Sequence, residues 1–406
     1  MYLLTGAVLS KEIIVDQNGE IATLTSAIAM AENGDRILIK PGIYREGEII
    51  IDKSVTIAGE DFPVFDGEDK YQVLRITADH VTIRGLDVRN CGVSFIDDNA
   101  GINVAEADSC IIEGNRLNKN FFGIYLAKSS GTRVINNQIA SNATAEASSG
   151  NGIHLWYCKG IVVEDNTISG HRDGIYFEFV QDGIIQRNTS FSNLRYGLHF
   201  MFSDRCQYRE NIIRDNGAGV AVMYTKNVVM EKNQFLNNWG SASYGLLLKD
   251  ITDSKITNNR FLNNSIAIFA ENSNRIIVEN NDFMENGWAV KIMANCLDNE
   301  FTGNNFIGNT FDVATNSRNN FSRFASNYWS GYRGYDLDRD GFGDVPFRPV
   351  RLFSLIVEQH SPALILQRSL FIDLLDMAEN IFPVLTPETL VDEKPLLKER
   401  HRLICL

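Results

Sequence analysis

One short phrase recurs ten times between residues 115 and 327, and this repeat constrains the fold more than any other feature. The phrase consists of two β-forming residues, two polar residues, an asparagine and an apolar residue, as in VINNQI and VMEKNQF. Seven of the nine intervals between successive asparagines lie within two residues of 22. The ten asparagines are Asn115, Asn137, Asn166, Asn188, Asn211, Asn233, Asn259, Asn281, Asn305 and Asn327. Because so short a unit cannot bury an apolar face alone, the repeats must stack.

A second phrase lies between the asparagines and has the order Gly-apolar-x-apolar-x, as in GIYLA and GLLLK. This alternation is typical of a strand with one buried face, and helical periodicity is absent from the stretch. We therefore expect an all-β fold, a right-handed parallel β-helix with about 4.8 Å between coils. The repeated asparagine predicts a structural ladder, because its amide can hydrogen-bond to the asparagine of the next coil.

The chain is acidic, with 51 Asp and Glu residues against 38 Lys and Arg residues and a formal charge of −13. No Lys/Arg stripe is present, so a nucleic-acid surface is disfavoured. No run of eighteen apolar residues occurs, so no membrane-spanning segment is predicted. The apolar start MYLLTGAVLS lacks a basic region and is too short for a full signal peptide. Six scattered cysteines form no CxxC motif and do not settle the compartment.

Four regions are expected along the chain. Residues 24–33 have helical spacing followed by glycine, which predicts a short helix covering the open first coil. The sequence changes after residue 330, first to a loop rich in Asp, Gly and aromatic residues and then to a helical pattern. The expected regions are an N-terminal strand and cap helix (1–40), the β-helix coils (41–330), the Asp/Gly-rich loop and end cap (331–360), and a helical partner-binding extension (361–406).

The C-terminal extension is too apolar for a solvated linker. Its apolar residues recur at the i, i+3, i+4, i+7 spacing of one helix face. The candidate partner-binding residues are Leu370, Phe371, Leu374, Leu375, Met377 and Ala378. A simple end cap is the alternative interpretation, since a β-helix needs a cover at its second end.

The two x positions of the strand phrase are expected to point outward and to form two neighbouring ladders. The first contains Tyr125, His154, Tyr176, His199, Ala221, Leu247, Ala267 and Lys291. The second contains Ala127, Trp156, Glu178, Met201, Met223, Lys249, Phe269 and Met293. An exposed strand face normally carries Lys, Thr, Ser and Glu, whereas these ladders hold two of the six histidines and three of the eight methionines. We therefore predict a binding face that includes Trp156, Tyr176 and Glu178.

The same ladders contain a candidate copper site, because thioether and imidazole ligands suit Cu(I). His199, Met201 and Met223 are expected on the same or adjacent coils. His154 also belongs to the candidate set, although two coils, about 10 Å, would separate it from His199. The alternative is an apolar face covered by a loop or a partner.

The segment DLDRDGFGD contains a second candidate metal site. Asp336, Asp338 and Asp340 alternate, Gly341 makes a sharp turn, and Asp344 occupies the ninth position. This order matches the first part of a Ca²⁺ loop. Phenylalanine occupies the twelfth position, where an EF-hand needs a bidentate glutamate, so an EF-hand is excluded. The alternative is a tight turn whose carboxylates cap backbone amides.

Catalytic motifs are weak, and we assign no catalytic residue. Asp97 and Asp98 form a carboxylate pair in a loop-like stretch, while Ser nucleophile elbows and P-loops are absent. A polysaccharide-active β-helix enzyme (a lyase, hydrolase or epimerase) is the alternative function, with Trp156, Tyr176 and Glu178 in its groove. No second acid is well placed beside Glu178 for glycoside chemistry.

Three segments together resemble the NosD family of accessory β-helix proteins for nitrous oxide reductase maturation. They are GDRILIKPGIYREGEIIIDKSVTIAGE, SNYWSGYRGYDLDRDGFGDVPFRPVRLF and RSLFIDLLDMAENIFPVLTPETLVDEKPLLK. The resemblance implies a non-catalytic periplasmic protein, membrane-associated through the membrane and ATPase subunits of an ABC transporter. It also implies a role in copper delivery to the copper–sulfur site of the reductase, with a copper chaperone and the reductase as further partners. The C-terminal extension would bind the transporter.

Overall fold

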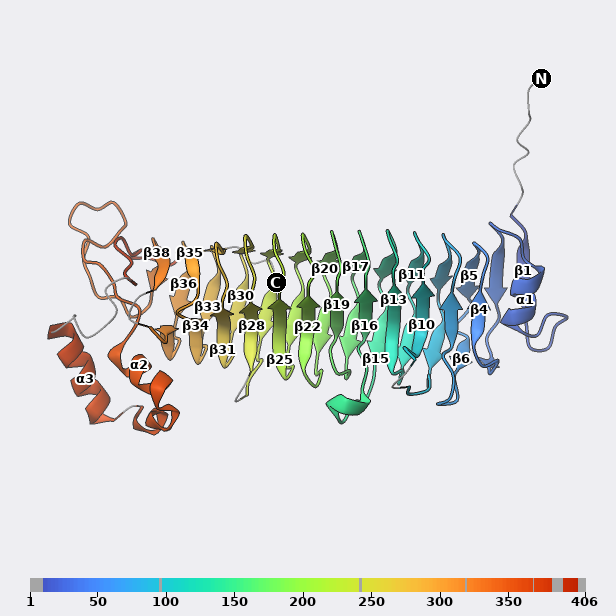
Figure 1. Cartoon of the computed structure of the whole chain (residues 1–406), viewed down its shortest axis with the longest axis horizontal. Helices are drawn as coiled ribbons and strands as arrows, with labels where there is room; N and C mark the ends of the chain where they lie inside the picture. Colours follow the sequence, from blue (N-terminus) through green and yellow to red (C-terminus); the bar gives the residue numbers. More distant parts are fainter. Residues whose placement is uncertain are drawn as a thin grey trace, which may run out of the picture. The chain divides into compact units, whose positions relative to one another are not determined.

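The computed structural model describes residues 10–94, 97–240, 243–317, 320–367, 369–381 and 390–400. The chain forms two compact units, residues 1–188 and residues 189–406. Each unit is a parallel β-solenoid in which every coil contributes one strand to each of three sheets. The predicted all-β parallel β-helix, with an N-terminal helix and a helical C-terminal extension, is confirmed (Figure 1). Right-handed coiling accords with the strong preference of parallel crossovers for that hand.

Among its described residues, unit 1 contains twenty strands, and their pairings are parallel. Its sheet 1 contains β1 (Glu12–Val15), β2 (Arg36–Ile39), β5 (Thr56–Gly59), β8 (Thr82–Arg84), β11 (Ile111–Glu113), β14 (Arg133–Ile135), β17 (Val162–Glu164) and β20 (Ile184–Gln186). Sheet 2 contains β3 (Ile43–Tyr44), β6 (Val64–Asp66), β9 (Asp87–Arg89), β12 (Arg116–Asn118), β15 (Gln138–Ala140) and β18 (Thr167–Ser169). Sheet 3 contains β4 (Ile49–Ile51), β7 (Leu74–Ile76), β10 (Ala100–Ala105), β13 (Phe122–Ala127), β16 (Ile153–Trp156) and β19 (Ile175–Glu178).

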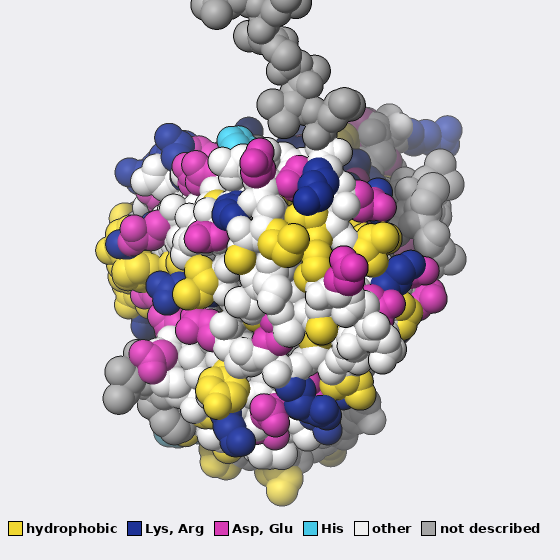
Figure 2. All heavy atoms as spheres, turned by 90° about the vertical axis from the view of Figure 1, so that its right-hand side faces the viewer, with side chains coloured by type: hydrophobic (Ala, Val, Ile, Leu, Met, Phe, Trp, Pro, Cys, Tyr) yellow, Lys and Arg dark blue, Asp and Glu magenta, His cyan; other side chains and the backbone are white. Residues whose placement is uncertain are grey.

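The helix α1 (Leu24–Met30) covers the first coil of unit 1. Thr23 caps it by accepting a hydrogen bond from the Ser26 N–H, and Leu24 is among the residues it buries against the coil. Lys53 Nζ donates to three carbonyl groups at the end of this helix, at 2.7–2.9 Å. The cation therefore satisfies orphan carbonyl groups at the negative end of the helix dipole. The surface at this end mixes hydrophobic side chains with charges of both signs (Figure 2).

Unit 2 repeats the same three-sheet plan. Its sheet 1 contains β23 (Gln207–Arg209), β26 (Val229–Glu231), β29 (Lys255–Thr257), β32 (Ile277–Glu279), β35 (Leu297–Thr302) and β38 (Phe321–Ala325). Sheet 2 contains β21 (Thr189–Phe191), β24 (Ile212–Arg214), β27 (Gln234–Leu236), β30 (Arg260–Leu262), β33 (Asp282–Met284), β36 (Asn305–Ile307) and β39 (Tyr328–Trp329). Sheet 3 contains β22 (Tyr196–Met201), β25 (Ala218–Met223), β28 (Tyr244–Lys249), β31 (Ile266–Glu271), β34 (Trp288–Ile292) and β37 (Phe311–Thr315).

The predicted asparagine ladder is present in both units. In unit 1, the Asn115 N–H donates to Asn137 Oδ1 at 3.0 Å, and the Asn137 N–H donates to Asn166 Oδ1 at 2.9 Å. In unit 2 the same bond joins, in order, Asn211, Asn233, Asn259, Asn281, Asn304 and Asn327. Each buried amide thereby satisfies backbone groups at a corner of the coil, which the chain could not otherwise bury.

One rung was predicted at the wrong residue. The Asn281 N–H donates to Asn304 Oδ1 at 2.8 Å, whereas the neighbouring Asn305 lies in β36 and hydrogen-bonds to Asp282 at 2.7 Å. Two adjacent asparagines fit the sequence phrase equally well. A second ladder, not predicted from the sequence, joins Asn193, Asn216, Asn238, Asn264, Asn286 and Asn309.

After the last coil, unit 2 continues into α2 (Leu352–Gln359), the 3-10 helix η2 (Ser361–Leu366) and α3 (Leu370–Ile381) (Figure 1). Residues 390–400 then return to the last coil, where Asp392 pairs with Phe324 and Leu396 with Tyr328 as parallel bridges. This part of the range 361–406, predicted as partner-binding, is therefore used to cover the chain's own last coil. For residues 390–400 this agrees with the alternative interpretation of an end cap, although the contacts span more than 60 residues of sequence.

Candidate functional site

The strand register of sheet 3 defines the two predicted ladders. In unit 1, His154 pairs with Tyr125 and Tyr176, and Trp156 pairs with Ala127 and Glu178. In unit 2, the first ladder contains His199, Ala221, Leu247, Phe269 and Lys291. The second contains Met201, Met223, Lys249 and Glu271. Met201 and Met223 therefore occupy adjacent coils, as predicted from the spacing.

The register of one coil was predicted incorrectly. Phe269 stands in the first ladder beside Leu247, not in the second, and Ala267 lies in the buried core. The error arose because this coil has alanine where the preceding coil has the marker glycine. An added Cβ at the equivalent Gly245 would lie 2.9 Å from the Ala267 carbonyl oxygen. Space at this position is therefore tight, and the next coil has there the smallest side chain after glycine, that of Ala267, which does not match the phrase.

The first ladder is buried, contrary to the expected outward exposure. Tyr125, His154, Tyr176 and His199 are all at most 9% exposed. In unit 1 the rings cover one another, because the centroid of the His154 ring lies 4.7 Å from the ring centroids of both Tyr125 and Tyr176. Tyr176 therefore lies in a buried layer of tilted and edge-to-face rings rather than on an open surface. The alternative of a covered apolar face describes this ladder better.

The surroundings of each histidine bear on metal binding. Asn151 Nδ2 lies 3.1 Å from His154 Nδ1, within unit 1. Arg195 Nη2 lies 3.4 Å from His199 Nδ1, and the Tyr196 ring packs 4.8 Å from the imidazole, within unit 2. A guanidinium group beside Nδ1 repels an approaching cation and competes for the same lone pair. Nδ1 of His199 is thus poorly placed to bind copper in this arrangement, and the place of His199 in the ligand set stays a prediction.

The two methionines fit a soft metal better. Met201 and Met223 are cross-strand partners on β22 and β25, and both side chains are partly exposed. Partners in adjacent parallel strands lie about 4.8 Å apart, so both thioethers can approach one ion. Thioether ligands select Cu(I) over harder cations. These two side chains are the members of the candidate set that could contact copper; the ligand set itself stays a prediction.

Four aromatic side chains follow the second ladder directly, three of them exposed and Phe179 partly exposed, and sequence reasoning missed them. In unit 1, Tyr157 stacks on Phe179 at 4.5 Å between ring centroids. In unit 2, Phe202 stacks on Tyr224 at 5.0 Å. All four have φ between +50° and +55°. Bulky residues rarely adopt this left-handed conformation, which carries a backbone cost.

We call these four residues the corner aromatics. The equivalent corner in other coils holds Lys128, Asp250 or Asn272, which are ordinary residues for a left-handed solvent-facing position. Exposed aromatic rings at strained positions are typical of recognition surfaces. The usable sequence signal was the aromatic residue directly after each second-ladder position, in LWY, FEF, FMF and VMY.

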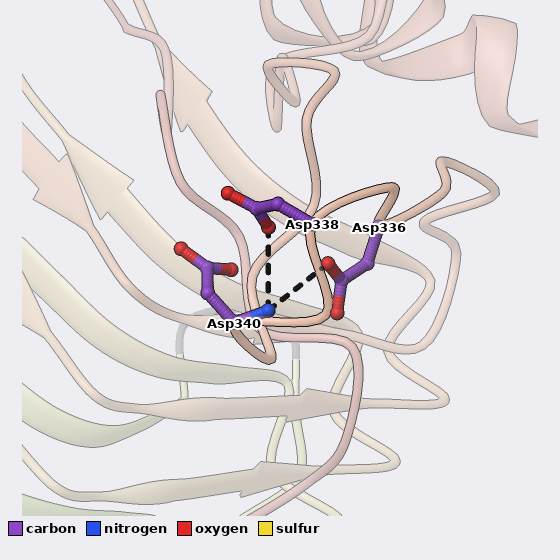
Figure 3. A group of neighbouring side chains, drawn as sticks. All are labelled: Asp336, Asp338 and Asp340. Atoms are coloured by element: carbon purple, nitrogen blue, oxygen red, sulfur yellow. Dashed lines mark hydrogen bonds between the residues drawn. The ribbon is translucent and has the colours of Figure 1, made fainter.

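The aspartate loop brings three of the four predicted calcium ligands together. Carboxylate oxygens of Asp336, Asp338 and Asp340 all lie within 4.8 Å of one another (Figure 3). Asp344 stands outside this group and accepts a hydrogen bond from the Leu337 N–H at 2.7 Å. The group has the oxygen ligands that Ca²⁺ prefers.

Backbone amides already engage these carboxylates. Asp336 accepts hydrogen bonds from the N–H groups of Arg339, Asp340 and Gly341. Desolvation alone would raise the pKa of Asp336, but these amides hold its pKa below the ordinary value. These hydrogen bonds are those expected for the alternative, a turn whose carboxylates cap backbone amides. Calcium binding at this loop stays a prediction.

The C-terminal helices expose a large apolar surface. Leu370, Phe371, Leu374 and Met377 on α3 are between 50% and 75% exposed, while Leu375 and Ala378 are partly buried. Ile365 of η2 is 88% exposed. We call these five exposed residues the α3 face. Soluble proteins rarely leave so many neighbouring large apolar side chains in water unless a partner covers them.

The preceding helix α2 anchors this surface to the coils. Phe353 and Val357 are buried against Phe311 of β37. Glu358 on α2 forms an ion pair with Lys291 of β34 at 2.6 Å, and both side chains are less than 20% exposed. No helix in the described part of the chain is long and apolar enough to cross a membrane.

A family model described as periplasmic copper-binding protein (NosD) matches residues 28–149 and 135–334. The chain belongs to the NosD family. A relative from Pseudomonas aeruginosa, named probable ABC transporter binding protein NosD, is 30% identical over 91% of this chain and 89% of its own length. A relative of the same name from Stutzerimonas stutzeri is 26% identical over 93% of this chain and 90% of its own length. The resemblance stated from the sequence is thus confirmed.

Solved structures similar to this NosD-family chain share the fold only. The surface adhesin PfbA of Streptococcus pneumoniae has a TM-score of 0.56 at 10% identity, covering 75% of this chain and 87% of the adhesin. The Dettilon tailspike protein has a TM-score of 0.53 at 13% identity, covering 76% of this chain and 69% of the tailspike.

Proposed function

We propose that this NosD-family protein is a non-catalytic periplasmic accessory protein for nitrous oxide reductase maturation. It binds an ABC transporter through the α3 face and contributes to copper delivery for the copper–sulfur site. Family membership supports the role, and the relatives named as transporter-binding proteins support the partner. The α3 face is the observation that carries the proposal, because five large apolar side chains stand in solvent on a helical segment tethered at both ends.

The charge of α3 indicates whether the helix binds a membrane surface or a protein groove. The charged residues of LFIDLLDMAENI are all acidic, and the segment contains no lysine or arginine. A membrane surface rich in anionic lipid would repel such a helix. A protein groove with an apolar floor and a basic rim fits it better, as in other helix-in-groove complexes. The transporter's membrane subunit is therefore the partner we assign to the α3 face, with its ATPase bound on the far side of the membrane.

Copper is the cargo in this proposal. Met201 and Met223 are proposed to contact Cu(I) transiently during transfer, with Phe202 and Tyr224 forming the adjoining contact surface for the copper chaperone or the reductase. Two thioethers without a strong third ligand hold copper weakly, which suits handover rather than storage. His199 contributes through Nδ1 only if Arg195 moves away from that atom. His154 and the binding-face residues Trp156 and Glu178 lie in unit 1 and keep the status of predictions.

A complementation experiment tests this function. A denitrifying host that lacks its own copy of the gene is supplied with wild-type protein, with Leu374→Glu plus Met377→Glu, or with the control Ile14→Glu, which changes a similarly exposed residue of β1. The readouts are the copper content of the purified reductase and its nitrous oxide turnover. Wild type and the control restore both, and the α3 variant does not. Full activity in the deletion host without any copy would overturn the proposal.

A further inference from the structure

A polar groove of about 580 Å³ runs along sheet 3 of unit 1, and its lining contains no residue of the α3 face or the methionine pair. Its volume lies within the usual range for ligand sites. Successive coils contribute side chains at matching positions, since Arg75 of β7 pairs in register with Ile50 of β4 and Asn103 of β10. We call it the Tyr71 groove, after the aromatic residue at its edge.

The floor of the Tyr71 groove is a chain of hydrogen bonds. Asn103 Nδ2 donates to Gln72 Oε1 at 2.8 Å, and Gln72 Nε2 donates to Glu48 Oε1 at 2.9 Å. Arg75 Nη1 lies 3.8 Å from the same Glu48 oxygen. Each side chain orients the next, so the floor presents polar groups in fixed directions without a ligand. Asn103 Oδ1 is buried beside the groove and accepts no hydrogen bond from any described residue, so its hydrogen-bonding capacity is unsatisfied without a ligand.

The edges of the groove add rings and carboxylates. Tyr71 is 45% exposed, so one face of its ring is open to solvent. Tyr125 is buried and interacts with the exposed carboxylate of Asp98 at the other edge. Burial is the main cause, and the neighbouring Asp98 carboxylate a further cause, of a pKa of Tyr125 that is raised well above that of ordinary tyrosine.

The composition of the groove restricts the ligand class. Three carboxylates (Glu48, Asp97 and Asp98) outnumber two cations (Lys70 and Arg75), and Arg75 is already paired with Glu48. A polyanion such as a uronate or nucleic acid is therefore disfavoured. An apolar ligand would leave the amides and carboxylates of the floor desolvated and unpaired. A neutral ligand with many hydroxyl groups and an apolar ring face satisfies both constraints.

We propose that the Tyr71 groove binds a neutral oligosaccharide. Ring hydroxyls of the sugar exchange hydrogen bonds with Glu48, Gln72 and Asn103, and the C–H face of a sugar ring packs on Tyr71. The site is independent of the copper and transporter roles, since none of its residues belongs to the α3 face or to the methionine pair. Binding alone is inferred, without cleavage of the sugar.

Calorimetric titration of the full chain with a panel of hexasaccharides tests the proposal. The panel contains cellohexaose, laminarihexaose, maltohexaose and chitohexaose as neutral probes, and hexagalacturonate as an acidic probe. We expect at least one neutral probe to bind, and Tyr71→Ala or Asn103→Ala to weaken it at least tenfold. The control Tyr335→Ala, which removes a similarly exposed tyrosine ring outside the groove, leaves the affinity unchanged. Tyr71→Ala is on the surface and keeps the thermal midpoint of the wild type.

Three results would overturn the inference. One is the absence of binding by every neutral probe, and another is binding by the acidic probe alone. The third is binding that survives both groove substitutions. If no sugar binds and Tyr71→Ala instead weakens assembly with the transporter or the reductase, the groove is a protein contact and the oligosaccharide assignment is wrong.

Discussion

Asp392 occupies the position that the next asparagine of the ladder would hold after Asn327. Its Oδ2 atom accepts hydrogen bonds from the Asn327 N–H at 2.9 Å and from Asn327 Nδ2 at 3.1 Å. Trp329 Nε1 donates to the same oxygen at 3.1 Å, and the Ser326 N–H donates to Oδ1 at 2.9 Å. The returning tail thus ends the ladder with an acceptor-only side chain, which suits a last rung that receives hydrogen bonds without a further coil to donate to.

The first prediction concerns this last rung. Asp392→Ala removes the acceptor of the Ser326 N–H, the Asn327 N–H and Trp329 Nε1, while Asn327 Nδ2 keeps its hydrogen bond to the Phe301 carbonyl. We expect a loss of about 3 kcal/mol in the free energy of unfolding of this end of unit 2. Asp392→Asn also lowers the free energy of unfolding. Its NH₂ group replaces one of the two carboxylate oxygens and cannot accept the hydrogen bonds that this oxygen receives. Urea unfolding followed by tryptophan fluorescence measures both variants. Lys394→Ala is the control, and an Asp392→Ala curve that matches wild type would contradict the prediction.

The second prediction concerns copper. Replacing Met201 and Met223 by leucine conserves side-chain volume and removes both thioethers, so we expect Cu(I) affinity in anaerobic competition with a chromogenic chelator to fall at least tenfold. Met284→Leu on sheet 2 is the matched control and should bind as wild type does. His199→Gln should have a smaller effect than the double methionine variant, because Arg195 competes for Nδ1. A larger effect of His199→Gln would restore the imidazole to the ligand set.

The third prediction concerns pH. Asp312 of β37 is partly buried and accepts a hydrogen bond from Asn309 Nδ2 at 3.3 Å, and burial raises its pKa from 3.8 to about 6. Between these values the folded protein binds more protons than the unfolded chain, so stability falls as pH rises from about 4 to about 6 and stays lower above that.

Asp312→Asn mimics the neutral form and should remove this loss. We expect the variant to be more stable than wild type by about 1–3 kcal/mol at pH 7 and of equal stability at pH 4. Denaturant unfolding at the two pH values gives the difference directly. A variant that is less stable than wild type at pH 7 would show that the charged carboxylate is favoured in the folded protein.

The fourth prediction concerns the aspartate loop. If Asp336, Asp338 and Asp340 hold Ca²⁺, millimolar Ca²⁺ should raise the thermal midpoint of wild type, because a ligand that binds only the folded state stabilises it by mass action. Asp338→Asn should abolish most of the shift, since it removes a charged ligand but not the three amide bonds to Asp336. If Ca²⁺ raises the thermal midpoints of wild type and Asp338→Asn equally, the ion binds at other sites. If Ca²⁺ does not raise the midpoint of wild type, the loop is an amide-capped turn without a calcium site.

The sequence predicted those features whose causes are local. Strand alternation and the 22-residue interval are properties of each coil, and they sufficed to place the coils, the ladder and the pairing of Met201 with Met223. Two local ambiguities produced errors. Asn304 and Asn305 fit one phrase, and Ala267 replaces a glycine that marks the strand. In both cases the residue is chosen by contacts with the neighbouring coil, which a single repeat does not reveal.

The features that the sequence did not predict depend on contacts between residues far apart in the chain. Asp392 hydrogen-bonds to Asn327, which lies 65 residues earlier in the sequence, so the periodicity of the repeat could not predict this contact. The burial of the first ladder results from rings on neighbouring coils covering one another, as between Tyr125 and His154. The Tyr71 groove requires side chains from successive coils and from a loop. Each of these features depends on stacking, and a pattern within one coil cannot reveal it.

The most direct test of the account is the affinity of the purified full chain for its detergent-solubilised ABC transporter, measured by biolayer interferometry. Wild type and Ile14→Glu should bind alike, whereas Leu374→Glu plus Met377→Glu should weaken binding at least a hundredfold, because charges enter an apolar contact. Binding by the α3 variant equal to that of wild type would contradict the central claim, since the exposed apolar face would then have no part in holding the transporter.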